Sequence, residues 1–257
     1  MNIVYGPVPS WRLGKSLGVD LICSKERICS FDCIYCQLGK PFIKSTNRKN
    51  FISIKKMKAE LHKALEKTSP DVITFSGTGE PTLADNFDIA IETIRDISQK
   101  PLAILTNSSL INKEDVRDTL SKLNIVVAKL DAHTENIFQK INRPANKISL
   151  IETIDGIKKF KKLFKGKLAI QIMFIKHNFE YANGIAQLIK NIQPDEIQIN
   201  TPLRPCPIKP LKDKQIAQIE EIFKANGLRT ISIYSSKKPK IAPLNKMELF
   251  KRRKSDL

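Results

Sequence analysis

Short apolar segments alternate with amphipathic segments along most of the chain. The apolar segments predict buried strands over residues 17–22, 71–76, 102–106, 125–130, 168–175, 196–200 and 228–234. The segments between them carry apolar residues at helical spacing and predict helices over residues 57–67, 87–97, 114–123, 149–164, 181–192 and 213–225. Near-continuous apolar strands separated by helices are typical of a parallel sheet that helices cover.

Six strand–helix units followed by one more strand predict an α/β fold. Six units are too few for a closed eight-stranded barrel, so we expect a partial (β/α)6 TIM-like barrel of parallel strands. From Ser235 onward the chain becomes polar and basic. We therefore predict one barrel domain over residues 1–235 and a basic C-terminal extension over residues 236–257.

Unusual polar residues follow the predicted strands at the points where the strands end. In barrels of parallel strands the reactive residues lie on the loops at the carboxyl ends of the strands, so we expect these residues to meet at one mouth. They are Cys29, Cys33, Cys36, Gly77, Thr78, Gly79, Glu80, Asn107, Ser108, Ser109, Asp131, His133 and Arg204.

The three clustered cysteines, Cys29, Cys33 and Cys36, form a Cys-x3-Cys-x2-Cys motif. Three thiolates on one short loop can hold three irons of a [4Fe–4S] cluster, which leaves the fourth iron open to bind and reduce a substrate. Structural zinc with Cys23 as fourth ligand is an alternative, although zinc sites usually pair two Cys-x-x-Cys motifs. Cys23 and Cys206 are otherwise interpreted as unliganded thiols, and Cys206 is a catalytic candidate because it follows the sixth strand at the predicted mouth.

The cysteine motif followed by Gly79-Glu80-Pro81 resembles the radical S-adenosylmethionine (SAM) superfamily. Further motifs, which extend over nearly the whole chain, resemble an uncharacterised branch that is grouped with wyosine-type tRNA synthases. Members of that branch usually carry Arg where Trp11 stands in this chain. The motifs are residues 5–20, Gln37-Leu38-Gly39, Ile141-Asn142-Arg143-Pro144 and Asn200-Thr201-Pro202-Leu203-Arg204-Pro205.

This resemblance implies roles for individual residues at the predicted mouth. The three cysteines would ligate a [4Fe–4S] cluster, and Asp131 would lie near the SAM ribose or the substrate as a catalytic candidate; its alternative role is a helix cap. A carboxylate such as Glu80 suits an ammonium, and glycines let the backbone approach a ligand closely. The implied SAM contacts are the backbone near Tyr35 for adenine, Gly77, Gly79 and Glu80 for the amino group, and Asn107 with Thr106 and Ser108 for the carboxylate or ribose.

The resemblance also implies a reaction. A flavodoxin- or ferredoxin-like donor would reduce the cluster, SAM would be cleaved to methionine and a 5′-deoxyadenosyl radical, and the radical would abstract a hydrogen atom from the substrate. We expect a tRNA nucleoside as substrate, from the branch resemblance and the basic clusters. Wyosine-type synthases use extra N-terminal cysteines for a second cluster, and here only Cys23 precedes the motif. The alternatives are a small metabolite or a protein as substrate and, in another class, a non-catalytic metal-binding RNA module.

The formal net charge of +18 favours contact with phosphate-rich partners such as tRNA. Residues 40–58 contain seven Lys or Arg and no acidic residue, and residues 237–254 form a second basic cluster. The alternative is that the lysines reflect genome composition and only solvate the surface. No apolar run approaches the ~20 residues that span a bilayer, and the first residues lack a signal-peptide pattern, so we expect a cytoplasmic protein without a membrane partner.

Overall fold

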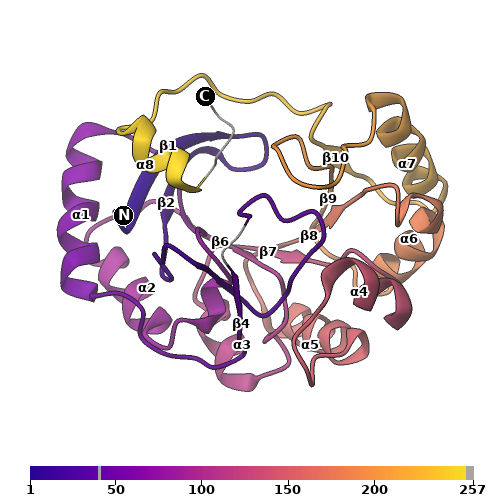
Figure 1. Cartoon of the computed structure of the whole chain (residues 1–257), viewed down its shortest axis with the longest axis horizontal. Helices are drawn as coiled ribbons and strands as arrows, with labels where there is room; N and C mark the ends of the chain where they lie inside the picture. The colour runs from indigo at the N-terminus through magenta and orange to yellow at the C-terminus, as the bar shows by residue number, and fades with distance from the viewer. Residues whose placement is uncertain (40–41, 253–257) are drawn as a thin grey trace.

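The computed structural model describes residues 1–39 and 42–252, in which an eight-stranded sheet curls into an open half-barrel (Figure 1). The strand order is β1-β2-β5-β6-β7-β8-β9-β10, and all neighbours from β2 to β10 are parallel. The predicted partial barrel of parallel strands is therefore confirmed. The sheet consists of β1 Val4–Ser10, β2 Gly14–Val19, β5 Val72–Phe75, β6 Leu102–Thr106, β7 Ile125–Lys129, β8 Lys167–Met173, β9 Glu196–Asn200 and β10 Ile231–Ser232.

Helices surround the sheet and cover its outer face (Figure 1). Helix α1 begins after Ser53, whose side chain accepts a hydrogen bond from the Lys56 amide. Each long helix turns an apolar stripe inward. These stripes and most of the buried strand residues form one large apolar core, beside which lie two smaller apolar clusters. The helices are α1 Ile54–Lys67, α2 Phe87–Arg95, α3 Glu114–Ser121, α4 Glu135–Asn142, α5 Leu150–Leu163, α6 Ala182–Lys190 and α7 Asp213–Ala225, with short 3-10 turns at Pro81–Leu83 and Phe179–Tyr181.

The edge strand β1 runs antiparallel to β2, and the sequence pattern does not predict it. Pro7 and Pro9 interrupt its apolar alternation. A proline cannot donate to a sheet ladder, so strands that contain it occupy sheet edges. The β1–β2 hairpin thus closes one side of the half-barrel with a strand that belongs at an edge.

A second, two-stranded sheet carries the start of the cysteine loop. Strand β3 Arg27–Cys29 pairs in parallel with β4 Phe42–Lys44, and the register places Lys44 beside Cys29. The Ser45 amide donates to the Cys29 carbonyl at 3.0 Å. The basic segment that follows the cysteines therefore returns to the first of them.

The basic C-terminal segment ends in a helix that packs on the barrel. Helix α8 Lys246–Arg252 lies against β1 (Figure 1), where Leu249 packs on Tyr5 and Val8. The buried Arg252 guanidinium lies 2.9 Å from the buried Asp20 carboxylate. The remainder of the predicted C-terminal extension, residues 253–257, lies outside the described residues. Within residues 1–39 and 42–252, no helix is both long and apolar enough to cross a membrane.

Candidate active site

A cavity of about 200 Å³ lies at the carboxyl ends of β6, β7 and β8. The barrel topology brings loops from distant parts of the chain to this edge of the sheet, as the sequence predicts. Seven residues predicted for the mouth or the site, Gly77, Thr78, Ser108, Ser109, Asp131, His133 and Cys206, lie outside its lining. The predicted residues that line it are Cys29, Cys33, Cys36, Tyr35, Gly79, Glu80, Thr106, Asn107 and Arg204.

Side-chain amides reach two of the cysteine sulfurs. Asn107 Nδ2 donates to Cys29 Sγ at 3.4 Å, and Asn142 Nδ2 donates to Cys33 Sγ at 3.5 Å. Burial raises the pKa of both thiols, that of Cys33 to about 11, while the Lys129 ammonium opposes the rise at Cys33. A bound metal displaces such thiol protons, and the amide donors then stabilise the thiolates.

This donor set fits an iron–sulfur cube. The cube takes one thiolate at each of three irons, so the cysteines surround a volume and do not converge on a point. In the described part of the chain, no three Cys, His, Asp or Glu side chains gather as the ligands of a single ion would. Cys23, the fourth ligand of the zinc alternative, lies elsewhere: its thiol faces the Met1 carbonyl at 3.7 Å and accepts from Arg252 at 3.5 Å.

The Gly79-Glu80 turn is fixed from both sides. The Glu80 amide donates to the Ile28 carbonyl at 3.1 Å, and a Cβ on Gly79 would lie only 1.7 Å from that carbonyl oxygen, so glycine is required there. The Glu80 carboxylate is 2% exposed. Its Oε1 accepts from Thr82 and from the Thr106 hydroxyl at 2.6 Å, and its Oε2 accepts from the Asn107 amide at 2.7 Å. Burial raises the Glu80 pKa, and these hydrogen bonds oppose the rise.

The turn after β6 uses Asn107 as its centre. Asn107 Oδ1 accepts from the Ser109 amide, and Nδ2 donates to Ser30 Oγ, both at 2.9 Å. Ser108 adopts a left-handed backbone conformation with a φ of 68°. Among the described residues its buried hydroxyl has no hydrogen-bond partner. The turn therefore joins the cysteine loop to β6 through Asn107.

Asp131 is the centre of a buried polar network behind the cavity. Its Oδ1 accepts from the Met173 amide at 2.8 Å, and its Oδ2 accepts from Asn142 at 2.7 Å and from the Tyr35 hydroxyl. Lys129 Nζ lies 3.6 Å from the same carboxylate and 4.7 Å from the centre of the Tyr35 ring. Asp131 therefore positions Tyr35 and Asn142, and Asn142 in turn contacts Cys33.

The structure adds cavity residues that sequence reasoning missed. Lys129 on β7 and Gln171 and Met173 on β8 face the cavity, and Gln37 lies at its edge beside Arg204, which the sequence predicts at the mouth. Gln171 Nε2 is buried and has no hydrogen-bond partner within the described residues, as expected of a group that awaits a polar ligand. Lys129 and Gln171 are each one polar residue within an otherwise apolar predicted strand, a signal that does not distinguish a side chain facing a cavity from one facing a helix.

The comparisons with known proteins agree with this site. The profile of the Radical SAM superfamily matches residues 25–189, more than half of the chain. The chain therefore belongs to the radical SAM superfamily. It is 40% identical over 232 residues to the UPF0026 protein MJ1312 of Methanocaldococcus jannaschii, which covers 87% of this chain and 71% of that protein. It is also 40% identical over 210 residues to the UPF0026 protein slr1464 of Synechocystis, covering 80% and 77%.

Solved structures show the same fold at low sequence identity. A radical SAM methyltransferase from Sphaerobacter thermophilus matches with a TM-score of 0.66 and 16% identity, over 87% of this chain and 69% of that one. Native anSMEcpe with bound AdoMet matches with a TM-score of 0.64 and 20% identity, over 85% and 64%. As a radical SAM iron–sulfur enzyme, the protein uses a [4Fe–4S] cluster and SAM and needs an electron donor.

Proposed function

We propose that this radical SAM enzyme modifies a nucleoside of tRNA and belongs with the wyosine-type branch of the superfamily. The observation that carries the proposal is the pairing of β3 with β4, which sets a basic segment beside the cysteine loop. An RNA backbone held by that segment would bring a nucleotide close to the cavity. An enzyme that acts on a base must first take it out of its stack, so a single-stranded or loop nucleotide is the target.

In this proposal the chain's own residues prepare the cavity for its cofactors. Cys29, Cys33 and Cys36 hold the cluster. A bound cluster would supply the electron for cleavage of SAM to methionine and a 5′-deoxyadenosyl radical, and that radical would take a hydrogen atom from the substrate. Glu80 Oε2, which accepts from the Asn107 amide, faces the SAM ammonium, and Gly79 lets the backbone come close. The residues that line the cavity exclude water from this reaction.

Other predicted residues act on SAM from neighbouring positions. The turn formed by Thr106, Asn107 and Ser108 binds its carboxylate or ribose, and Gln171 supplies a further donor. The backbone near Tyr35 meets adenine. Asp131 acts through Tyr35 and Asn142, to which it is hydrogen bonded. Gly77 sits against the Asp20 carboxylate, where a Cβ would lie 2.1 Å from its carbon, so it shapes the loop that carries Gly79.

The basic segment supplies phosphate contacts at the mouth. Lys44, Lys49, Lys55 and Lys56 are exposed. Lys55 and Lys56 belong to the first turn of α1, and in strand–helix units the helix N-terminus lies near the carboxyl end of the preceding strand. Arg48 differs: it is paired with Asp115 and lies 3.6 Å from Asp85, so it anchors the segment to the barrel. A flavodoxin- or ferredoxin-like protein delivers the electron.

Anaerobic incubation with SAM, a reductant and total tRNA tests this function, with nucleoside mass spectrometry as the readout. We expect one nucleoside to change mass, and no change with the Cys33→Ala variant. Replacement of tRNA by total small metabolites or total protein tests the alternative substrates. SAM cleavage stimulated by one of those fractions, with every tRNA nucleoside unchanged, would refute the proposed substrate.

A further inference from the structure

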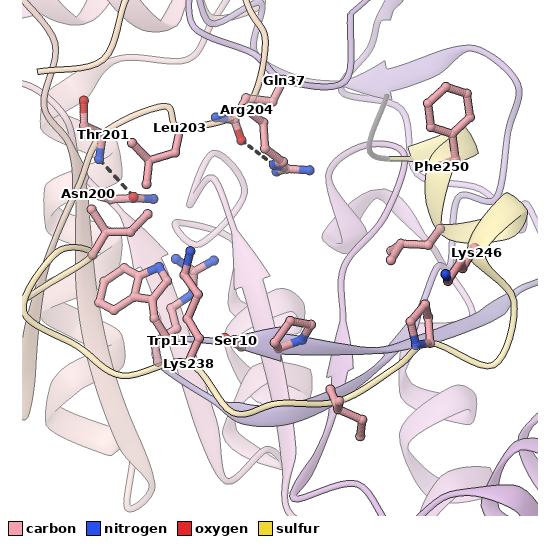
Figure 2. A pocket seen from close by; sticks show the side chains of 16 residues that line it. Ser10, Trp11, Gln37, Asn200, Thr201, Leu203, Arg204, Lys238, Lys246 and Phe250 are labelled. Atoms are coloured by element: carbon pink, nitrogen blue, oxygen red, sulfur yellow. Dashed lines mark hydrogen bonds between the residues drawn. The ribbon is translucent and has the colours of Figure 1, made fainter. Parts of the chain in front are cut away.

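A second cavity of about 660 Å³ adjoins the cluster cavity. The tip of the β1–β2 hairpin, the loop after β9 and the C-terminal segment with α8 enclose it (Figure 2). Gln37 and Arg204 line both cavities, and Arg204 Nε donates to Gln37 Oε1 at 2.8 Å. This hydrogen-bonded pair therefore stands at the boundary between the place where a radical forms and a volume large enough for a small-molecule ligand.

Among the described residues, the charged side chains that line this second cavity are all cationic. Its lining includes four cationic residues, Arg12, Arg204, Lys238 and Lys246, and none of its described lining residues is acidic. Figure 2 shows Lys238 and Lys246 on opposite sides of the open space. Low-dielectric walls that carry charges of one sign concentrate ions of the other sign. The cavity thus suits an anionic ligand, and Lys and Arg are the residues that recognise phosphate.

The same cavity offers a flat apolar wall. Trp11 lines it, and the Arg12 guanidinium lies 5.3 Å from the indole centre. Indole and guanidinium planes are the groups on which proteins stack nucleobases. Buried Asn200 and Thr201 add amide and hydroxyl groups that can pair with the edge of a base. An anion alone would not need these groups, whereas a nucleotide uses both kinds.

We propose that this second cavity binds one nucleotide, with its base against Trp11 and its phosphate held by cationic side chains of the lining, which include Lys238 on one side and Lys246 on the other. The ligand then lies beside the Gln37–Arg204 pair, next to the cluster cavity. The proposal deepens the proposed function and rests on it only for the source of the nucleotide, which is RNA in one case and the free nucleotide pool in the other.

Trp11 is the only tryptophan in the chain, so its fluorescence reports on this cavity. The experiment titrates the four nucleoside 5′-monophosphates into oxidised holoenzyme saturated with SAM, which fills the adenine site of the cluster cavity. We expect at least one monophosphate to quench Trp11, and the nucleoside without phosphate to bind at least tenfold more weakly. Citrate, an anion without a base, should leave Trp11 unchanged.

Paired variants distinguish binding of the monophosphate in the cavity from its attraction to general surface charge. Lys238→Ser/Lys246→Ser removes two lining charges and should weaken the monophosphate at least tenfold. Lys237→Ser/Lys240→Ser removes two exposed charges from the same segment outside the lining and should change affinity less than twofold. Equal weakening by both pairs, equal binding of citrate, or an unchanged Trp11 with every monophosphate and with tRNA overturns the proposal.

The outcomes also separate this inference from the proposed function. Monophosphate binding with no modified tRNA nucleoside would retain the cavity and assign it a free nucleotide. A modified tRNA nucleoside whose yield is unaffected by Lys238→Ser/Lys246→Ser and by Trp11→Leu would retain the function and refute the cavity.

Discussion

At the scale of single residues, the cysteines differ in their surroundings although all five are free thiols. Cys29, Cys33 and Cys36 line one cavity, while Cys23 and Cys206 do not. We expect about four irons per chain after anaerobic reconstitution. An alanine at any of the three cavity positions should abolish SAM cleavage and the iron–sulfur absorbance, because a cube corner loses its ligand. Cys23→Ala and Cys206→Ala should retain iron content, and the reverse pattern would refute the ligand assignment.

Gln171 gives a second test at this scale. Its buried amide lacks a partner within the described residues, so SAM is expected to supply one. Gln171→Leu should weaken SAM binding by roughly fivefold to tenfold, since a net hydrogen bond is worth about 1 kcal/mol. Equilibrium dialysis of SAM against holoenzyme measures this effect. Gln198→Leu on β9, also buried but outside the cavity, is the matched control, and equal losses in both variants would exclude a direct contact by Gln171.

At the scale of elements, the local hydrophobic pattern is sufficient to predict a strand or helix that packs only on the common apolar core. The predicted strand at residues 196–200 and helix at 213–225 coincide with β9 and α7, because their apolar stripes only need a barrel to pack on. Helix α8 is not predictable in this way. Its lysines and arginine indicate a solvated tail, and the partners that fold it onto the barrel, Asp20 and Tyr5, come from the opposite end of the chain.

Likewise, some residues of the candidate site could be predicted from the local sequence and others could not. The cysteines and the Gly79-Glu80 turn could be predicted, since strand-end loops of a parallel barrel must meet at one edge. Lys129 and Gln171 could not, because one polar residue within a strand looks the same whether it faces a cavity or a helix. The second cavity depends on three segments far apart in sequence, and no local pattern reports their approach.

Helix α8 has an expected structural role that can be measured. Arg252 pairs with Asp20, which also accepts from the Thr78 amide and hydroxyl at 3.2 and 3.1 Å, so the helix end supports the Gly77–Gly79 loop. Arg252→Met leaves a buried carboxylate without its cation and should cost about 3–5 kcal/mol. For a chain of this size the melting temperature should fall by roughly 10 °C.

Lys224→Met is the control for that measurement, because Lys224 is exposed and its pairing with Glu221 is a surface contact. It should change the melting temperature by about 1–2 °C at most. Calorimetry on both apo variants decides between them. Similar melting temperatures for Arg252→Met and Lys224→Met would show that α8 contributes no more than surface charge.

At the scale of the whole molecule, the net charge of +18 supports specific RNA binding only if lysines near the mouth contribute more to that binding than lysines elsewhere on the surface. Lys44, Lys49, Lys55 and Lys56 lie toward the mouth, while Lys67, Lys162, Lys190 and Lys224 lie near the C-terminal ends of their helices, at the opposite edge of the barrel. Phosphate contacts release counterions, so the logarithm of tRNA affinity should fall with the logarithm of salt by roughly 0.7–0.9 per contact.

Replacing the four mouth lysines by Ser should therefore reduce that salt slope by about 3. The four lysines at the opposite edge, replaced by Ser in a second variant, remove the same charge and should leave most of the slope in place. Fluorescence anisotropy of labelled tRNA at several salt concentrations measures both slopes. Because the two variants have the same net charge, a difference between them can arise only from where the lysines lie. Equal slopes would mean that RNA meets only the average charge of the surface, and a small metabolite or a protein would then be the better substrate.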